Sequence, residues 1–113
     1  MLRVPFIRRC SLEWEGRPDP TSAFTVNINV LGAYVAFDDM PHLGEPVRFR
    51  VRLPETEREL SIDGVVAWVN PRQQHPVHSL PPGFGISFRA LSDENRRAIE
   101  GVVDEYVARQ PGR

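Results

Sequence analysis

The chain has 113 residues, a length that suits one domain with a single hydrophobic core, and we expect residues 1–113 to form that domain. Its 14 basic and 15 acidic side chains leave a net charge of -1, which argues against general attraction to nucleic acid or to an anionic membrane. No run of about 18 apolar residues is present, so a membrane span is not expected.

The first ten residues are interrupted by Arg3, Arg8 and Arg9, where a secretory signal would need a continuous apolar segment. The only cysteine, Cys10, cannot form an internal disulfide, which suits a reducing compartment. Its apolar neighbours favour a small core side chain over a reactive thiol. We therefore expect a cytoplasmic protein.

Alternation of apolar and polar residues predicts short strands in the first third of the chain. From residue 6 to residue 14 the even positions form an apolar face, on which Arg8 is the polar member. Strands are predicted over 22–28 and 33–37. Turns are predicted at 16–21, which contains two prolines, and at 38–44.

Three more strands are predicted further along the chain. Residues 47–53 alternate between an apolar stripe and an outward stripe of Arg48, Arg50 and Arg52. A strand over 59–69 contains Gly64, where we expect a bulge, and a last strand covers 84–88. Six short antiparallel strands favour a closed barrel, because closure removes the exposed edges of an open sheet.

A helix is predicted after the last strand. Ser92 or Asp93 can cap it, and Pro111-Gly112 ends it. Its apolar residues fall on one stripe, formed by Ile99, Val102, Val103, Tyr106 and Val107. The predicted fold class is therefore mainly β, a six-stranded antiparallel barrel with one C-terminal α-helix.

The segment 70–82 is long for a connection between strands, and its four prolines limit its freedom. We expect a rigid, shaped loop that a partner protein could contact. Its His75 and His78 form an incomplete ligand set without a nearby Cys or carboxylate, so no metal site is predicted.

Two amides and a glycine interrupt the apolar run between residues 27 and 35. Asn27 and Asn29 lie two positions apart, so their carboxamides would face the same side of an extended chain. Gly32 allows a tight turn or the close approach of another group. One interpretation is a turn between two strands, in which asparagine bonds to the backbone. The other is a polar ligand site.

Arg3-Val4-Pro5, Asn27-x-Asn29-x-x-Gly32 and the run from Gly83 to Phe88 before a helix together resemble the PilZ domain family, over nearly the whole chain. The resemblance implies a six-stranded antiparallel barrel. It also implies, as in many members, binding of the bacterial second messenger cyclic di-GMP through an N-terminal R-x-x-x-R and a later [D/N]-x-S-x-x-G.

Arg3 matches the second arginine of the first family motif, and Asn27, Asn29 and Gly32 match the later one, with Asn29 in place of serine. The first arginine would precede Met1; the alternative register of Arg3 with Arg8 has four residues between them instead of three. The predicted ligand-binding residues are Arg3, Arg8, Arg9, Asn27, Asn29 and Gly32.

Guanidinium groups suit a cyclic dinucleotide, because they pair bidentately with phosphate and stack on flat rings. No nucleophile elbow, phosphate loop or zinc motif is present, so an enzyme is not expected. We expect no cofactor other than cyclic di-GMP as a candidate ligand. The first hypothesis is a receptor that binds cyclic di-GMP and acts through protein contacts; the alternative is an adaptor that contacts a protein partner without binding it.

Overall fold

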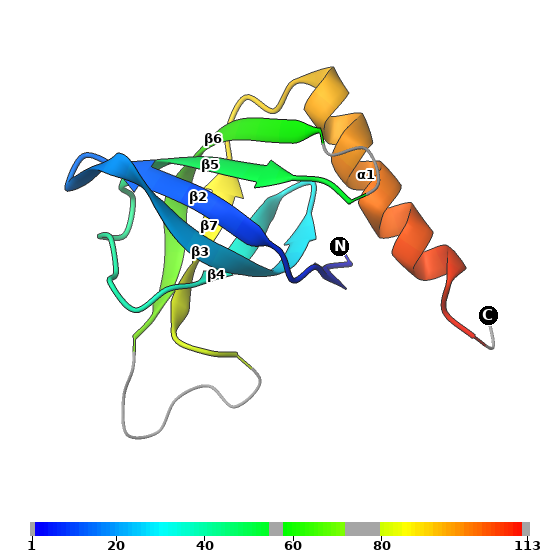
Figure 1. Cartoon of the computed structure of the whole chain (residues 1–113), viewed down its shortest axis with the longest axis horizontal. Coiled ribbons are helices and arrows are strands. Elements are labelled where there is room, and N and C mark those ends of the chain that lie inside the picture. Colours follow the sequence, from blue (N-terminus) through cyan, green and yellow to red (C-terminus); the bar gives the residue numbers. More distant parts are fainter. Residues whose placement is uncertain (1, 55–57, 72–79, 112–113) are drawn as a thin grey trace.

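The computed structural model describes residues 2–54, 58–71 and 80–111 (Figure 1). One helix, α1 (Asp93–Ala108), follows the strands in the chain. The strands are β1 (Val4–Pro5), β2 (Arg9–Trp14), β3 (Arg17–Asn29), β4 (Gly32–Ala36), β5 (Pro46–Arg52), β6 (Glu59–Asn70) and β7 (Gly83–Phe88).

The strands close into a ring in the order β3-β2-β5-β6-β7-β4, with β4 paired back to β3. Every pairing in the ring is antiparallel. The short β1 lies outside the ring and adds two residues alongside β3. The predicted six-stranded antiparallel barrel with one C-terminal helix is therefore confirmed.

The barrel interior is filled by the apolar stripes that the alternation predicted. On β5, Val47, Phe49 and Val51 are buried, and the Phe49 ring stacks on Phe88 with 5.8 Å between centroids. The intervening arginines face outward and pair with acids on neighbouring strands. Arg48 bonds Asp63 at 2.9 Å and Arg50 bonds Glu13 at 2.9 Å.

The predicted turn at 16–21 is wrong in extent. The chain turns at Glu15-Gly16, and β3 already begins at Arg17. The pairing between β2 and β3 shifts register between Leu12 and Trp14, which leaves the proline-containing stretch outside the regular ladder. Proline has no N–H to donate to a neighbouring strand, so this irregularity accommodates the prolines within the strand.

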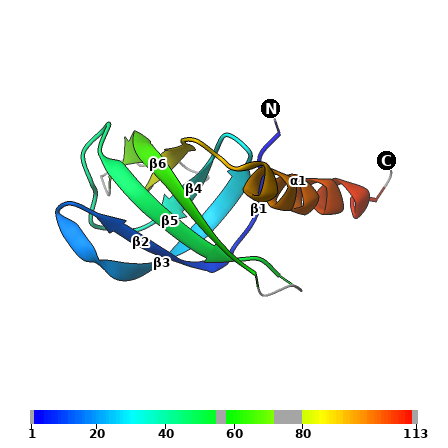
Figure 2. The same ribbon diagram turned by 90° about the horizontal axis from the view of Figure 1, so that it is seen from above.

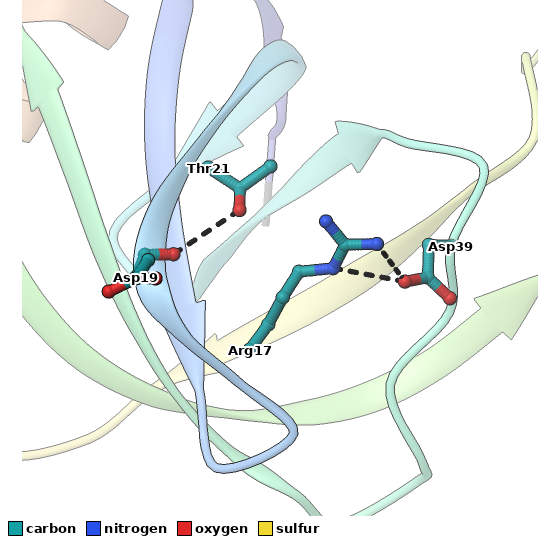
Figure 3. A network of polar contacts seen from close by, with 4 residues as sticks. All are labelled: Arg17, Asp19, Thr21 and Asp39. Atoms are coloured by element: carbon teal, nitrogen blue, oxygen red, sulfur yellow. Dashed lines mark hydrogen bonds and ion pairs between the residues drawn. The ribbon is translucent and has the colours of Figure 1, made fainter.

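Arg17, the first residue of β3, links β3 to the β4–β5 connection. Its guanidinium bonds Asp39 of the β4–β5 connection, while Thr21 donates to the Asp19 carbonyl at 3.3 Å (Figure 3). The same guanidinium lies over the rings of Trp14 and Phe37, at 5.9 and 5.4 Å from their centroids. The Arg17–Asp39 ion pair is partly exposed, so solvent weakens it. The contacts of the guanidinium with the two rings therefore contribute much of the packing of the Arg17 side chain.

The predicted bulge at Gly64 is also wrong. Gly64 keeps regular register with Val47 and Phe88, and β6 instead shifts register between Val66 and Trp68. A Cβ at position 64 would lie 2.7 Å from the Ser87 carbonyl oxygen. Glycine is therefore required here by the close approach of β7, not by a bend in β6.

Helix α1 begins as predicted, with Ser92 accepting a hydrogen bond from the Asn95 N–H at 3.0 Å. Ile99 is fully buried, and the core-packed side of the helix continues through Val102, Val103 and Tyr106. Val107 is 42% exposed, so its predicted place on the packed stripe is wrong. The C-terminal half of α1 extends past the barrel (Figures 1 and 2).

Burial raises the pKa of the Cys10 thiol from 9.0 to about 12. Because the pKa of the folded state lies above that of the unfolded state, the unfolded chain loses the thiol proton first as the pH rises. The contribution of the buried, neutral thiol to the free energy of unfolding is therefore complete below pH 9 and is lost as the pH rises toward 12. Relative to a Cys10→Ala variant, we expect the free energy of unfolding to fall by up to roughly 4 kcal/mol across this range. Urea unfolding of both proteins at a series of pH values measures the difference, and parallel pH profiles would contradict the prediction.

Candidate functional site

One row of residues crosses four strands on the outside of the barrel. Asn27 of β3 lies opposite Tyr34 of β4, Tyr34 opposite Gly85 of β7, and Gly85 opposite Trp68 of β6. Residues directly opposite each other in antiparallel strands place their side chains on the same face. Residues far apart in the sequence are thereby brought together on one surface.

Two irregularities in the ladder turn Asn27 and Trp68 outward. On β3, the buried Thr25 would place Asn27 inward by simple alternation, but the register shifts between these two residues. On β6, the buried Val66 would likewise place Trp68 inward, and a second shift separates them. Both shifts add a residue on one strand only, so the side chains that follow them change face.

Gly85, at the centre of this row, has no side chain to project from the outer surface of the sheet. A Cβ built there would be in ordinary contact with Trp68, 3.7 Å from its Cβ. The Trp68 ring thus packs over Gly85 and reaches Tyr34, with 5.4 Å between ring centroids. A longer side chain at position 85 would stand between the two rings.

The hydroxyl of Tyr34 bonds Pro81 and Asn70, two residues outside this row. Its hydroxyl donates to the Pro81 carbonyl at 2.6 Å and accepts from Asn70 Nδ2 at 3.1 Å. Burial raises the pKa of the Tyr34 hydroxyl, and the hydrogen bond from Asn70 acts in the opposite direction. These bonds tie β4 to the end of β6 and the approach to β7, which fixes the support beneath Trp68.

The row forms the wall of a pocket of about 480 Å³, which we call the tryptophan pocket. Arg3 enters it from the N-terminal segment and donates from Nη1 to Asn27 Oδ1 at 3.1 Å. Trp68 is 43% exposed, a large open fraction for this side chain. The lining residues are Arg3, Asn27, Leu31, Tyr34, Ala67, Trp68, Leu80, Gly85, Ile86 and Ser87.

The family model of the PilZ domain matches residues 2–105. The chain belongs to the PilZ domain family. A crystal structure of the PilZ domain of CeSA from a cellulose synthesizing bacterium superposes with a TM-score of 0.64 at 12% identity, covering 95% of this chain and 99% of that one. At this identity the likeness shows the fold alone. A search of curated proteins finds no match.

PilZ domains are regulatory binding domains, and cyclic di-GMP is the ligand typical of the family. Of the residues predicted to bind it in this PilZ domain, the structure brings Arg3 and Asn27 together in the tryptophan pocket.

Asn29 and Gly32 lie in the turn that joins β3 to β4. Asn29 is 2% exposed, and its Oδ1 accepts from the N–H groups of Leu31 and Gly32 at 2.8 and 3.1 Å. A Cβ on Gly32 would lie 2.0 Å from the Ile86 carbonyl oxygen. The turn interpretation therefore accounts for both residues in this PilZ domain, and their ligand role stays a prediction.

Arg8 and Arg9 line a different pocket, of about 560 Å³, which we call the arginine pocket. It is formed on β2, β3 and β5, whereas the tryptophan pocket is formed mainly on β4, β6 and β7. The structure thus separates Arg8 and Arg9 from Arg3 and Asn27. A role for Arg8 or Arg9 in binding cyclic di-GMP stays a prediction.

Trp68 and Tyr34 are not among the site residues predicted from the sequence. Trp68 has the same parity as Leu60 and Ile62 in the predicted strand, so alternation assigns it to the core. The signal available was Gly85, which alternates with apolar residues in the last strand and marks a bare position on the outer face.

Within the described ranges, no cluster of three or more His, Cys, Asp or Glu side chains could hold a metal ion. His75 and His78, and most of the loop predicted over 70–82, lie outside the described residues. In the same ranges, no helix is both long enough and apolar enough to cross a membrane.

Proposed function

We propose that this PilZ domain is a cytoplasmic regulatory module that binds cyclic di-GMP in the tryptophan pocket and signals through contact with a protein partner. The observation that carries the proposal is an arginine hydrogen-bonded to Asn27 beside the exposed face of Trp68, within one pocket.

The three side chains match the chemistry of a cyclic dinucleotide. An aromatic face stacks on a base with about 1–3 kcal/mol per base, which suits Trp68 and a guanine. A guanidinium pairs bidentately with phosphate, which suits Arg3. The carboxamide of Asn27 offers donors and an acceptor to a guanine edge, and its contact with Arg3 orients both groups.

The alternative function is an adaptor that contacts a protein partner without binding cyclic di-GMP. The observation that favours it is the burial of Asn29, at the motif position where the family has serine. Because its Oδ1 already accepts from two backbone N–H groups in the turn, that oxygen is occupied before any ligand arrives.

Calorimetric titration with cyclic di-GMP tests the receptor function. We expect binding to weaken by roughly ten-fold or more in Trp68→Ala and in Arg3→Ala, since each removes a stacking face or a charge-assisted bond. Trp68→Phe should retain much of the affinity because it keeps an aromatic face. Arg48→Ala is the matched control for Arg3→Ala, because Arg48 pairs with Asp63 outside the pocket.

Thermal unfolding with cyclic di-GMP gives an independent readout. A ligand at hundred-fold excess over its dissociation constant adds about 2.7 kcal/mol to the stability of the folded state. Absence of heat and of thermal stabilisation at millimolar cyclic di-GMP would refute the receptor function and leave the adaptor. Binding that is unaffected by Trp68→Ala and Arg3→Ala would place the ligand elsewhere.

A further inference from the structure

The arginine pocket lies across the barrel from the tryptophan pocket. In the ring order β3-β2-β5-β6-β7-β4, β2 is three strands from β7 and β5 is three strands from β4. The two pockets therefore open on opposite sides of the molecule, and a ligand in one leaves the other accessible.

The arginine pocket is hollow because short side chains lie between long ones. Ser11 of β2 faces Ser22 of β3 directly across the ladder, and both side chains point out of the barrel. Phe24 and Arg9 form the next outward pair along the same two strands, and Arg50 lies opposite Ser11 on β5. The serines thus form a low floor with hydroxyl groups, and the longer side chains form the rim.

Arg9 is held in place on this rim while most of its donors remain available. Its guanidinium carbon lies 5.2 Å from the centroid of the Phe24 ring, and Nη1 donates to Ser22 Oγ at 3.0 Å. In the described ranges Arg9 forms no ion pair with a carboxylate. A fixed guanidinium loses little side-chain entropy when it binds a carboxylate, which favours recognition of one.

The side chain of Ile7 is exposed to solvent beside this pocket. The hydroxyl of Thr25, which is fully buried, accepts from the Arg8 N–H at 3.1 Å and donates to the Phe6 carbonyl at 2.5 Å. These bonds hold the backbone on both sides of Ile7, whose side chain is 76% exposed. Phe24 is 47% exposed nearby, so two large apolar side chains flank the arginine.

We propose that the arginine pocket binds a short acidic segment of a partner protein that carries a bulky apolar side chain. A carboxylate of the segment pairs with Arg9, and the apolar side chain packs between Ile7 and Phe24. The hydroxyls of Ser11 and Ser22 are positioned to bond the backbone or side-chain oxygens of the segment.

The charges around the pocket favour a peptide over a long polyanion. Arg50 is neutralised by Glu13 at 2.9 Å, and Glu59 lines the same pocket. With a net charge of -1 on the whole chain, a nucleic acid or anionic membrane would meet acids beside the basic site. A short segment needs only the local field of the rim. This inference names a contact surface for the proposed protein partner and does not require cyclic di-GMP binding.

Selection of a phage-displayed library of random peptides on the intact protein, without cyclic di-GMP, tests the proposal. We expect enrichment of peptides that combine Asp or Glu with a Leu, Ile or Phe. Synthetic versions, measured by fluorescence anisotropy, should bind at least ten-fold more weakly to Arg9→Glu and several-fold more weakly to Phe24→Ser and Ile7→Ser. Binding should also weaken as salt is raised.

Arg48→Glu is the control for Arg9→Glu, because Arg48 lies on the same outer face of the barrel but does not line the arginine pocket. It should bind the enriched peptides as tightly as the unmodified protein. Melting temperatures establish that each variant is folded, and Arg9→Ala provides a milder substitution if Arg9→Glu is not.

Three results would overturn the proposal: no enrichment, enrichment of basic peptides, or peptides that bind Arg9→Glu and Phe24→Ser unchanged. Displacement of the peptides by cyclic di-GMP would assign the pocket to that ligand instead. Tighter binding of a labelled oligonucleotide that depends on Arg9 would assign it to nucleic acid. A receptor function that fails while these peptides bind leaves the present inference intact.

Discussion

A Gly32→Ala substitution is expected to lower the free energy of unfolding by about 3 kcal/mol or more, out of a total of about 5–15. The added Cβ would lie 2.0 Å from the Ile86 carbonyl oxygen and 3.1 Å from its carbonyl carbon. Both atoms belong to the backbone of β7, which pairs with β4 at this point. The clash is therefore relieved only by separating two strands that close the barrel.

Gly101→Ala is the matched control for this change. Position 101 lies inside α1, and a Cβ there meets nothing within 4 Å. The same substitution should therefore stabilise the protein by about 0.5–1 kcal/mol, because alanine is the better helix former. Urea unfolding of both variants measures the contrast, and a Gly32→Ala variant as stable as Gly101→Ala would contradict the structure at the β4–β7 pairing.

The close approach of β7 to Gly32 also bears on how the glycine of the family motif is interpreted. Glycine at the end of Asn27-x-Asn29-x-x-Gly32 invites the interpretation that a ligand approaches the backbone there. The structure gives a sufficient reason without a ligand, since the approaching group is β7. Loss of ligand binding in Gly32→Ala would therefore be evidence for a binding role only if the variant is folded.

Local patterns were enough to predict the barrel and its helix. Alternation over 47–53 gave the inward and outward faces of β5, because one face of each strand is buried. The serine at 92 gave the start of α1, because its hydroxyl satisfies an N–H of the first turn. Both features depend on neighbours in sequence or on a single periodicity.

The errors at Trp68 and Gly64 concern contacts between strands that are distant in the sequence. The shift that turns Trp68 outward depends on how β6 pairs with β7, and nothing within residues 59–69 marks Ala67 as the added residue. A bulge was predicted at Gly64, but a glycine within a strand also permits the close approach of a neighbouring strand. Only the nearness of Ser87 distinguishes these two roles. A one-residue shift reverses every later side chain, so it decides the content of a pocket.

The candidate site was therefore predicted in part. Arg3 and Asn27 were selected from motif spacing and lie in one pocket, while Trp68 was missed for the reason above. Arg8 was grouped with Arg3 as an alternative register of the family's R-x-x-x-R motif, and Arg9 follows Arg8 directly in the sequence. The hydroxyl of Thr25 bonds the backbone of Phe6 and of Arg8, and Arg8 and Arg9 line the arginine pocket instead of the tryptophan pocket.

A Leu60→Asp substitution is expected to unfold the protein. Leu60 is fully buried in the barrel and lies opposite Val51 of β5. A carboxylate without a partner in such a site costs several kcal/mol, a large part of the roughly 5–15 kcal/mol that stabilises a domain of this kind. Loss of the cooperative thermal transition in circular dichroism is the expected result.

Leu43→Asp makes the same chemical change at a leucine that is 64% exposed in the β4–β5 connection. Surface substitutions of this kind change stability by about 0.5 kcal/mol or less, so this variant should melt with the unmodified protein. The pair separates the effect of burial from the effect of added charge, because both variants lower the net charge equally. If Leu60→Asp and Leu43→Asp melted together, position 60 would not lie in a closed core, and the inward register of β6 against β5 would be wrong.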